Sequence, residues 1–268
     1  MPDEAREFAL LCPRCGEENP PEFPVCWSCH AALPADRRPK KEQAAVQELE
    51  EPPDPLRRKR IALELGVAIL VIWVPGLVGG IWRAVEPQPP QGTVATLWGL
   101  LHVAGILALL AYFAWLDGDW RQLLGLERPR IWKELAWGAA AFVAVLVAHH
   151  LASRITLVLG LDQGPVQGYR LAPEARWLAP FDFALHALNE EVFFRAYLWR
   201  RFTELTRRPT LSLVIASALF SAAHVYPISY SISVLFFGLT FAAFFRTRPS
   251  VWPLVLAHWA FNLFVAAG

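Results

Sequence analysis

The sequence predicts an all-α fold, a polytopic membrane helical bundle of about seven spans, with a small zinc-ribbon module at its N-terminus. The 268 residues are 55% hydrophobic and only 18% charged, which is too apolar for an ordinary soluble domain. The charged residues crowd into the first 60 positions, and long apolar runs fill the remainder. The net charge of +1 argues against a general nucleic-acid binder, so we expect no nucleic-acid partner.

The N-terminal module, residues 1–32, contains all the cysteines of the chain: Cys12, Cys15, Cys26 and Cys29. Two C-x-x-C pairs separated by ten residues can place four thiolates around one zinc ion. So short a segment has too little core to fold unaided, so metal binding would supply the folding free energy. Two disulfides, or a redox-active C-x-x-C, are the alternatives. A structural zinc favours a reducing compartment.

A tether and a membrane domain follow. Residues 33–60 are charged and rich in proline, without a sustained apolar period, which predicts a flexible linker. Residues 61–268 predict the transmembrane domain. The apolar segments long enough to span, or nearly so, are 61–82, 93–116, 134–158, 178–202, 210–226, 230–245 and 251–267. An eighth, re-entrant segment near 164–177 is left open.

The orientation follows from lysine and arginine. Fourteen of these residues lie immediately before the first span, at 57–60, or near the alternate loops after it, against four on the other side. This asymmetry predicts a multi-pass protein of the cell membrane with a cytosolic N-terminus. The lipid bilayer is therefore an expected partner, and the zinc ribbon is a candidate binding module for a cytosolic protein.

The fourth predicted span carries the costliest polar residues. Glu190 and Glu191 stand side by side in a run that is otherwise apolar, and charged groups within a membrane usually mark function. Glu191 and Arg195 are four residues apart, so they lie on one helix face and can pair. Glu190 points about 100° away and is left for other work.

Two later spans supply partners for Glu190. The fifth contains FSAAH, from Phe220 to His224, and the seventh contains HWAFN, from His258 to Asn262. Counted from the cytosolic helix ends, Glu190, His224 and Asn262 lie about 18–21 Å deep and His258 about 12 Å. A carboxylate, two imidazoles and a carboxamide in one dry layer suit hydrolysis by an activated water.

The segments NEEVFFR, FSAAH and HWAFN resemble the motifs E-E-x-x-x-R, F-x-x-x-H and H-x-x-x-N, in order and on separate helices. They are similar to the CPBP family of intramembrane glutamic proteases, the CAAX-prenyl-protease and bacteriocin-processing family. The resemblance covers roughly residues 178–267. It implies a metal-independent peptidase on a helical membrane fold, with no cofactor in the active site.

The same resemblance implies a role for each motif residue. Glu190 would be the catalytic base and His224 would hold the water, while His258 and Asn262 would form the oxyanion hole. Glu191, Arg195 and Phe220 would be supporting residues. The expected substrate is a membrane-associated or lipidated polypeptide. Two alternatives stand beside this hypothesis: a zinc-dependent membrane hydrolase built on the same side chains, and a non-catalytic membrane scaffold or immunity-type protein.

Overall fold

The computed structural model describes residues 10–16, 18–19, 33, 55–85, 91–118, 120–126, 129–161, 171–224 and 227–267. The chain forms two compact units, Met1–Lys59 and Arg60–Gly268. In the first unit, β1 (Leu10–Leu11) pairs antiparallel with β2 (Glu18–Asn19), Leu10 opposite Asn19. Cys12 and Cys15 lie on the turn between these strands, whereas Cys26 and Cys29 lie outside the described residues.

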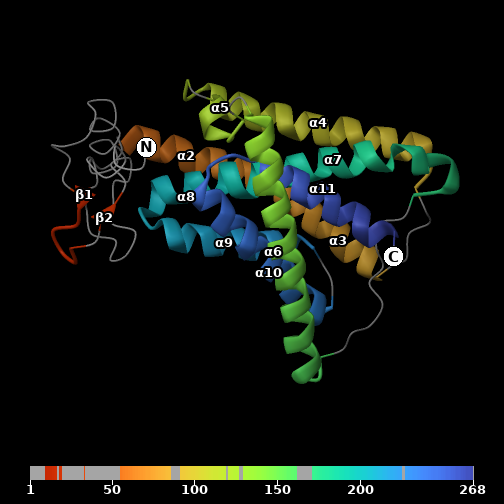
Figure 1. Ribbon diagram of the computed structural model, residues 1–268. Helices are drawn as coiled ribbons and strands as arrows, with labels where there is room; N and C mark the ends of the chain where they lie inside the picture. Colours follow the sequence, from red (N-terminus) through yellow and green to blue (C-terminus); the bar gives the residue numbers. More distant parts are fainter. Residues whose placement is uncertain are drawn as a thin grey trace. The chain divides into compact units, whose positions relative to one another are not determined.

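Within the described residues, every regular element from Pro55 onward is a helix, as predicted (Figure 1). The bounds are α2 (Pro55–Ala68), the π-helical η1 (Ile69–Trp73), α3 (Val74–Val85), α4 (Thr93–Trp115), α5 (Trp120–Leu123), α6 (Ile131–Val158), the 3-10 helix η2 (Pro173–Leu178), α7 (Ala179–Glu190), the π-helical η3 (Glu191–Leu198), α8 (Trp199–Thr206), α9 (Pro209–Ala223), α10 (Ile228–Thr247) and α11 (Trp252–Ala267).

Prolines and a left-handed residue explain several boundaries. Pro209 and Pro173 stand in the first turn of their helices, where a missing amide hydrogen is harmless. The α2–η1–α3 helix widens into a π turn just before Pro75, which has no amide hydrogen for the usual helical bond. Helix α8 ends at Arg207, whose φ of 58° is left-handed and stops the helix.

Among the described residues, four helices are long and apolar enough to cross a membrane: Pro55–Trp82, Thr93–Trp115, Ile131–Val158 and Ile228–Thr247. The first begins before residue 61, where the sequence placed its start. Helices α9 and α11 are apolar but shorter, and the continuous helix from α7 through η3 to α8 contains several charged residues. A membrane crossing by these last three remains a prediction.

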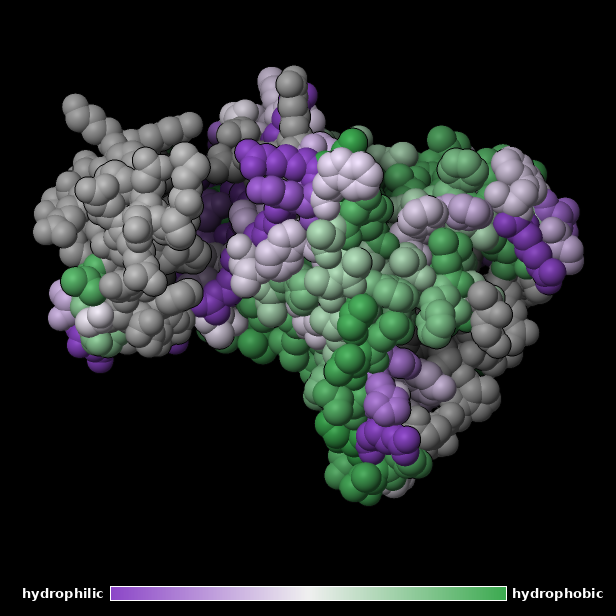
Figure 2. All heavy atoms as spheres, in the orientation of Figure 1, coloured by the Kyte–Doolittle hydropathy of each residue, from purple (hydrophilic) through white to green (hydrophobic). Residues whose placement is uncertain are grey.

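Hydrophobic packing joins these helices into one bundle. Helix α6 packs against α10 and α11, α9 packs against α10, and α11 also contacts α7. The η3 turn is buried along its whole length, so the residues around Glu191 form the centre of the core. The visible surface of the helical unit is mostly hydrophobic, and hydrophilic residues gather in separate patches (Figure 2).

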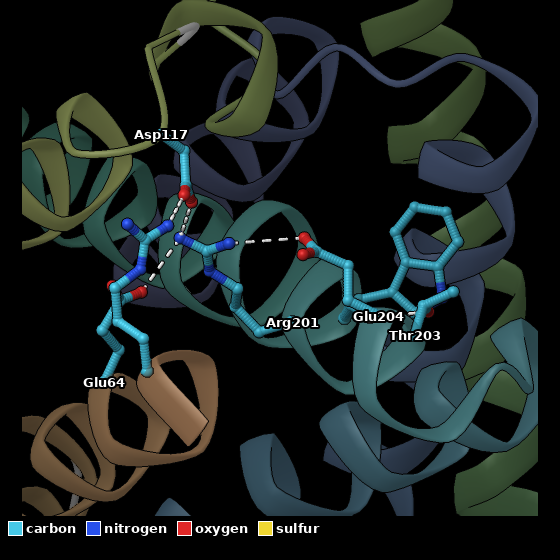
Figure 3. Close-up of polar contacts among 7 residues, drawn as sticks. Glu64, Asp117, Arg201, Thr203 and Glu204 are labelled. Atoms are coloured by element: carbon cyan, nitrogen blue, oxygen red, sulfur yellow. Dashed lines mark hydrogen bonds and ion pairs between the residues drawn. The ribbon is translucent and has the colours of Figure 1, made fainter. Parts of the chain in front are cut away.

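A buried ionic cluster fastens three helical segments together (Figure 3). Arg201 of α8 is fully buried, and it pairs with Glu64 of α2 at 3.0 Å, with Glu204 at 3.4 Å, and with Asp117 after α4. Arg60 completes the cluster by pairing with Glu64 at 3.3 Å and with Asp117. Neither Arg201 nor Glu64 carries a signal in the sequence that predicts this cluster.

Candidate active site

The two adjacent glutamates lie where an α-helix becomes a π-helix. Glu190 is the last residue of α7 and Glu191 the first of η3. A π turn adds one residue to a helical turn, and such turns are frequent at functional sites. The two side chains leave the helix in different directions, and His258 is the neighbour that they share.

Glu190 faces two imidazoles from two other helices. Its Oε2 atom lies 3.8 Å from Nε2 of His224 and 3.7 Å from Nε2 of His258. Both distances exceed that of a direct hydrogen bond. Oε2 is buried and has no hydrogen-bond partner among the described residues. The structure therefore brings together one carboxylate and two imidazole nitrogens, as the depth count predicts.

His224 lies just beyond the end of α9, although the sequence placed it inside a span. It is the C-cap residue, with φ −93° and ψ 87°, outside the helical region. Its ring atom Nδ1 lies 2.8 Å from the backbone oxygen of Phe220. Its backbone N–H donates to the backbone oxygen of Ser221 at 3.1 Å. With Nδ1 held by a carbonyl, the ring presents Nε2 to Glu190.

Glu191 connects the site to its support. Its Oε1 lies 2.8 Å from Nδ1 of His258, and its Oε2 lies 3.2 Å from Nε of Arg195. The side chains are 0% exposed for Glu191, 2% for Arg195 and 7% for His258. The ion pair expected between Glu191 and Arg195 is present, and the bond to His258 is additional to it.

Phenylalanine rings enclose His258 and Arg195. The Arg195 guanidinium lies 4.1 Å from the centre of the Phe220 ring, a cation–π contact. Phe220 also stands against the His224 ring at 4.6 Å. Phe237 meets the His258 ring edge-on at 4.8 Å, and Phe241 does so at 6.0 Å. Phe220 was expected to be a supporting residue. The two α10 rings belong to a run rich in phenylalanine, and no motif in the sequence distinguishes them from its other rings.

Asn262 is placed apart from the polar contacts. It follows His258 by four residues on α11, hence on the same face, and its side chain is half-buried. Its side chain makes no hydrogen bond within the described part of the chain.

A second carboxylate–imidazole pair lies on α7, where Nδ1 of His186 is 3.4 Å from Oδ1 of the buried Asp182.

A cavity of about 500 Å³ opens beside His224. Its lining comes from α3, α9, α10 and the α9 C-cap: Leu77, Ile81, Ala218, Ser221, Ala222, His224, Ser231 and Leu235. This volume lies within the range of small-molecule sites, about 300–1,000 Å³. The walls are mainly apolar, and one imidazole of the Glu190 cluster reaches them.

No group of three or more His, Cys, Asp or Glu side chains in the described residues is arranged to hold a metal ion. The backbone around Cys12 and Cys15 suits the use of these two cysteines as thiolate ligands of a metal ion. The Arg14 amide lies 3.4 Å from Sγ of Cys12, and Gly16, with φ +74°, donates its N–H to Cys12 O at 2.9 Å. An amide aimed at sulfur favours the charged thiolate.

Comparison with known protein families finds a match to the C-terminal part of the chain. Residues 172–264 match the family model described as Type II CAAX prenyl endopeptidase Rce1-like. No curated protein and no solved structure is significantly similar to the chain. The matched stretch runs from the start of η2 into α11, and it includes Glu190, His224, His258 and Asn262. Residues 172–264 are thus similar to the Rce1-like family of type II CAAX prenyl endopeptidases.

Proposed function

We propose that the chain is a membrane peptidase that hydrolyses peptide bonds of membrane-associated or lipidated polypeptides with a water activated by Glu190. The observation that supports this proposal most is the buried Glu190 oxygen facing imidazole nitrogens at 3.7 and 3.8 Å. Proteins bridge polar groups at such separations with a water molecule. Here the bridging water would be the nucleophile.

In this mechanism Glu190 takes a proton from the water while the hydroxide oxygen attacks the carbonyl carbon of the substrate. His224 holds the water through Nε2. His258 and Asn262 stabilise the oxygen that becomes negatively charged in the tetrahedral intermediate. When the C–N bond breaks, Glu190 returns the proton to the leaving nitrogen. A carboxylic acid and an amine are the products, and Glu190 is again a carboxylate.

The cavity beside His224 supports an apolar group in the substrate. Leucine, isoleucine and alanine make up most of its walls, beside two serines and His224, and such a lining suits an aliphatic chain. A peptide with a lipid group or an apolar segment could place that part between α3 and α10, and its scissile bond near Glu190. This geometry favours lipidated or membrane-inserted polypeptides as substrates.

For the N-terminal unit, a structural role of zinc is proposed separately. We propose that Cys12, Cys15, Cys26 and Cys29 hold one structural zinc ion that folds the first unit. The local geometry around Cys12 supports this, since an amide faces its sulfur. Such a ribbon on the cytosolic side would bind a protein partner or a substrate.

Replacing Glu190 by glutamine tests the peptidase proposal, because the amide keeps the shape of the side chain and cannot act as a base. We expect Glu190→Gln to lower kcat by about 10²–10⁴-fold, the usual contribution of general acid–base catalysis. The measurement is cleavage of a panel of lipidated and transmembrane peptides by the full-length protein in detergent.

Glu174→Gln is the matched control, because Glu174 is an exposed carboxylate of η2 in the same matched stretch. We expect wild-type cleavage from this variant and a wild-type melting temperature from both. A well-folded wild-type protein that cleaves no peptide of the panel would favour the scaffold hypothesis. Full activity of Glu190→Gln would remove Glu190 from the chemistry.

A further inference from the structure

Two polar side chains of the bundle core carry atoms that the protein itself does not pair. Arg195 is 2% exposed, and its Nε atom lies 3.2 Å from Oε2 of Glu191. Its other two nitrogens, Nη1 and Nη2, are buried and have no hydrogen-bond partner among the described residues. The same holds for the hydroxyl of Ser217 on α9, a residue that is also 2% exposed. Buried polar groups are nearly always hydrogen-bonded to protein or to ordered water, so these atoms need a partner.

The aromatic neighbours of Arg195 do not supply that partner. The guanidinium carbon lies over the Phe220 ring at 4.1 Å and over the Phe241 ring at 5.7 Å. A ring face attracts the positive charge, but it is a weak hydrogen-bond acceptor compared with an oxygen atom. The N–H bonds of Nη1 and Nη2 therefore still require an oxygen or an anion.

Both unpartnered groups line one small cavity. It lies between η3, α8, α9 and α10, and it offers about 10 Å³ of space to a water-sized molecule. Besides Arg195 and Ser217, its lining has one polar side chain, Trp199, whose indole N–H donates to the backbone oxygen of Pro209 at 2.9 Å. The remaining walls are phenylalanine, leucine and alanine side chains. A ligand of this cavity would thus meet the side-chain polar atoms of Arg195 and Ser217.

Small residues on α9 and α10 create this space. Gly238 of α10 approaches α9 so closely that a Cβ atom there would lie 3.3 Å from Cβ of Ser217. This contact fixes the distance between the two helices. Ala242 on α10 and Ala216 on α9 line the cavity, and their short side chains do not fill it.

The size of the cavity indicates a single water molecule as its ligand. One water needs about 10–15 Å³, so a polyatomic ion such as phosphate is too large. A buried water typically makes about three hydrogen bonds. Its oxygen would accept from Nη1 and Nη2 of Arg195, and one of its hydrogens would be donated to Oγ of Ser217.

The local charge argues against a halide ion, which is the competing small acceptor. Glu191 already balances the charge of Arg195 through the ion pair at Nε. A chloride ion in the cavity would add a buried negative charge without a cation of its own, and burial of uncompensated charge is costly. A neutral acceptor meets the same hydrogen bonds without that cost.

We propose that this cavity binds one buried water molecule that bridges Nη1 and Nη2 of Arg195 to the hydroxyl of Ser217. The proposal goes beyond the peptidase function and does not depend on it. The water would join α9 to η3 by hydrogen bonds, across an interface that is otherwise held by apolar packing. A chain of polar contacts would then run from Glu191 through Arg195 and the water to Ser217.

A crystal structure of the full-length protein, at a resolution that shows other buried waters, tests the site directly. We expect one density peak within hydrogen-bond distance of the Arg195 Nη atoms and of Ser217 Oγ. Crystals grown in bromide should give no anomalous signal at this position. A bromide signal, or a cavity without a peak, would overturn the proposal.

Two variants of Ala242 with the same shape test the need for an acceptor in solution. Valine and threonine both displace the water, but only threonine brings an oxygen for the charged donors of Arg195. We expect the melting temperature of Ala242→Thr to exceed that of Ala242→Val by about 3–10 °C, because crowding is equal in the two variants.

Ala243→Val and Ala243→Thr are the matched controls, because Ala243 is the next residue of α10 and is exposed. We expect no advantage of threonine at this position. A dry cavity would reverse the order at Ala242, since a buried hydroxyl without a partner is costly, and Ala242→Val as stable as Ala242→Thr would overturn the proposal. Neither measurement uses peptide cleavage, so failure of the peptidase proposal would leave this test unaffected.

Discussion

At the residue scale, Arg201 shows how much a single buried charge determines. It is 0% exposed and pairs with Glu64, Asp117 and Glu204 (Figure 3). Removing one partner of a buried ionic cluster leaves the others uncompensated, and this usually costs more than the pair contributed in the first place.

We expect Arg201→Met to lower the free energy of unfolding by about 3–5 kcal/mol, because Glu64 would then keep only its contact with the half-exposed Arg60. Thermal unfolding in detergent measures the effect. Arg208→Met is the matched control, since that side chain is exposed and lies seven residues further on. Equal melting temperatures for the two variants would contradict the structural importance of the cluster.

The double variant Arg201→Met with Glu64→Leu separates the charge from the packing. It removes a buried carboxylate together with its cation, while Asp117 keeps Arg60 as a partner. We expect it to be more stable than Arg201→Met alone. A further loss of stability would mean that Glu64 contributes through contacts other than its charge.

The residues of the site were easier to predict than those of the cluster. Glu190, His224 and His258 belong to short motifs with a fixed spacing, and helix geometry alone places Glu190 and His224 at similar depth, with His258 nearer the cytosolic end. Glu64 and Arg201 are 137 positions apart, and no local pattern links them. The bond from Glu191 to His258 was missed for the same reason, since only tertiary packing brings α11 against η3.

At the scale of elements, close packing between α9 and α10 holds the site together. A Cβ atom on Gly238 of α10 would lie 3.2 Å from the Phe220 ring and 3.3 Å from Cβ of Ser217. Phe220 in turn contacts both His224 and Arg195. Glycine thus lets α10 approach α9 closely enough to support the rings of the site.

We expect Gly238→Leu to destabilise the protein by about 1–3 kcal/mol and to reduce activity, because the new side chain displaces Phe220. Gly99→Leu is the matched control, since nothing lies within 4 Å of the corresponding position on α4. Melting temperature and peptide cleavage are measured for both. Equal behaviour of the two variants would show that the α9–α10 contact is not needed for the site.

The elements themselves follow from the sequence to different degrees. Long apolar runs predicted α4, α6 and α10 closely, since length and composition suffice there. The π turns at η1 and η3 were not predicted, because they depend on packing and on the position of Pro75. For the same reason His224 was placed inside a helix, whereas α9 ends one residue before it.

At the scale of the whole molecule, the chain has two units, and we expect them to be stabilised in different ways. The helical unit has a continuous hydrophobic core. The proposed ribbon would depend on metal for its fold. The zinc ribbon expected over residues 1–32 and the linker expected over 33–60 stay predictions, and the sequence does not name a partner for the first unit.

We expect a strong chelator to remove one zinc ion per chain and to leave peptide cleavage by Glu190 in place, because the proposed chemistry needs no metal. Metal content and cleavage are measured on the same sample, and Cys12→Ser should contain less zinc while still cleaving a short peptide. Cleavage that disappears with the chelator in the wild type and persists in untreated Cys12→Ser would place a metal in the membrane site.

The π-helical segment η3 has a consequence for how this chain tolerates changes in length. It begins with Glu191 and carries Arg195 at its middle, and α8, which follows it directly, contains Arg201. Deleting one residue between Arg195 and Arg201 would turn everything after it by about 100° around the helix axis. The glutamates would keep their partners while Arg201 would swing away from Glu64. The number of residues in this turn therefore sets the relative orientation of the active-site residues around Glu191 and the ionic cluster around Arg201. We expect the length of this segment to matter as much as the identity of these side chains.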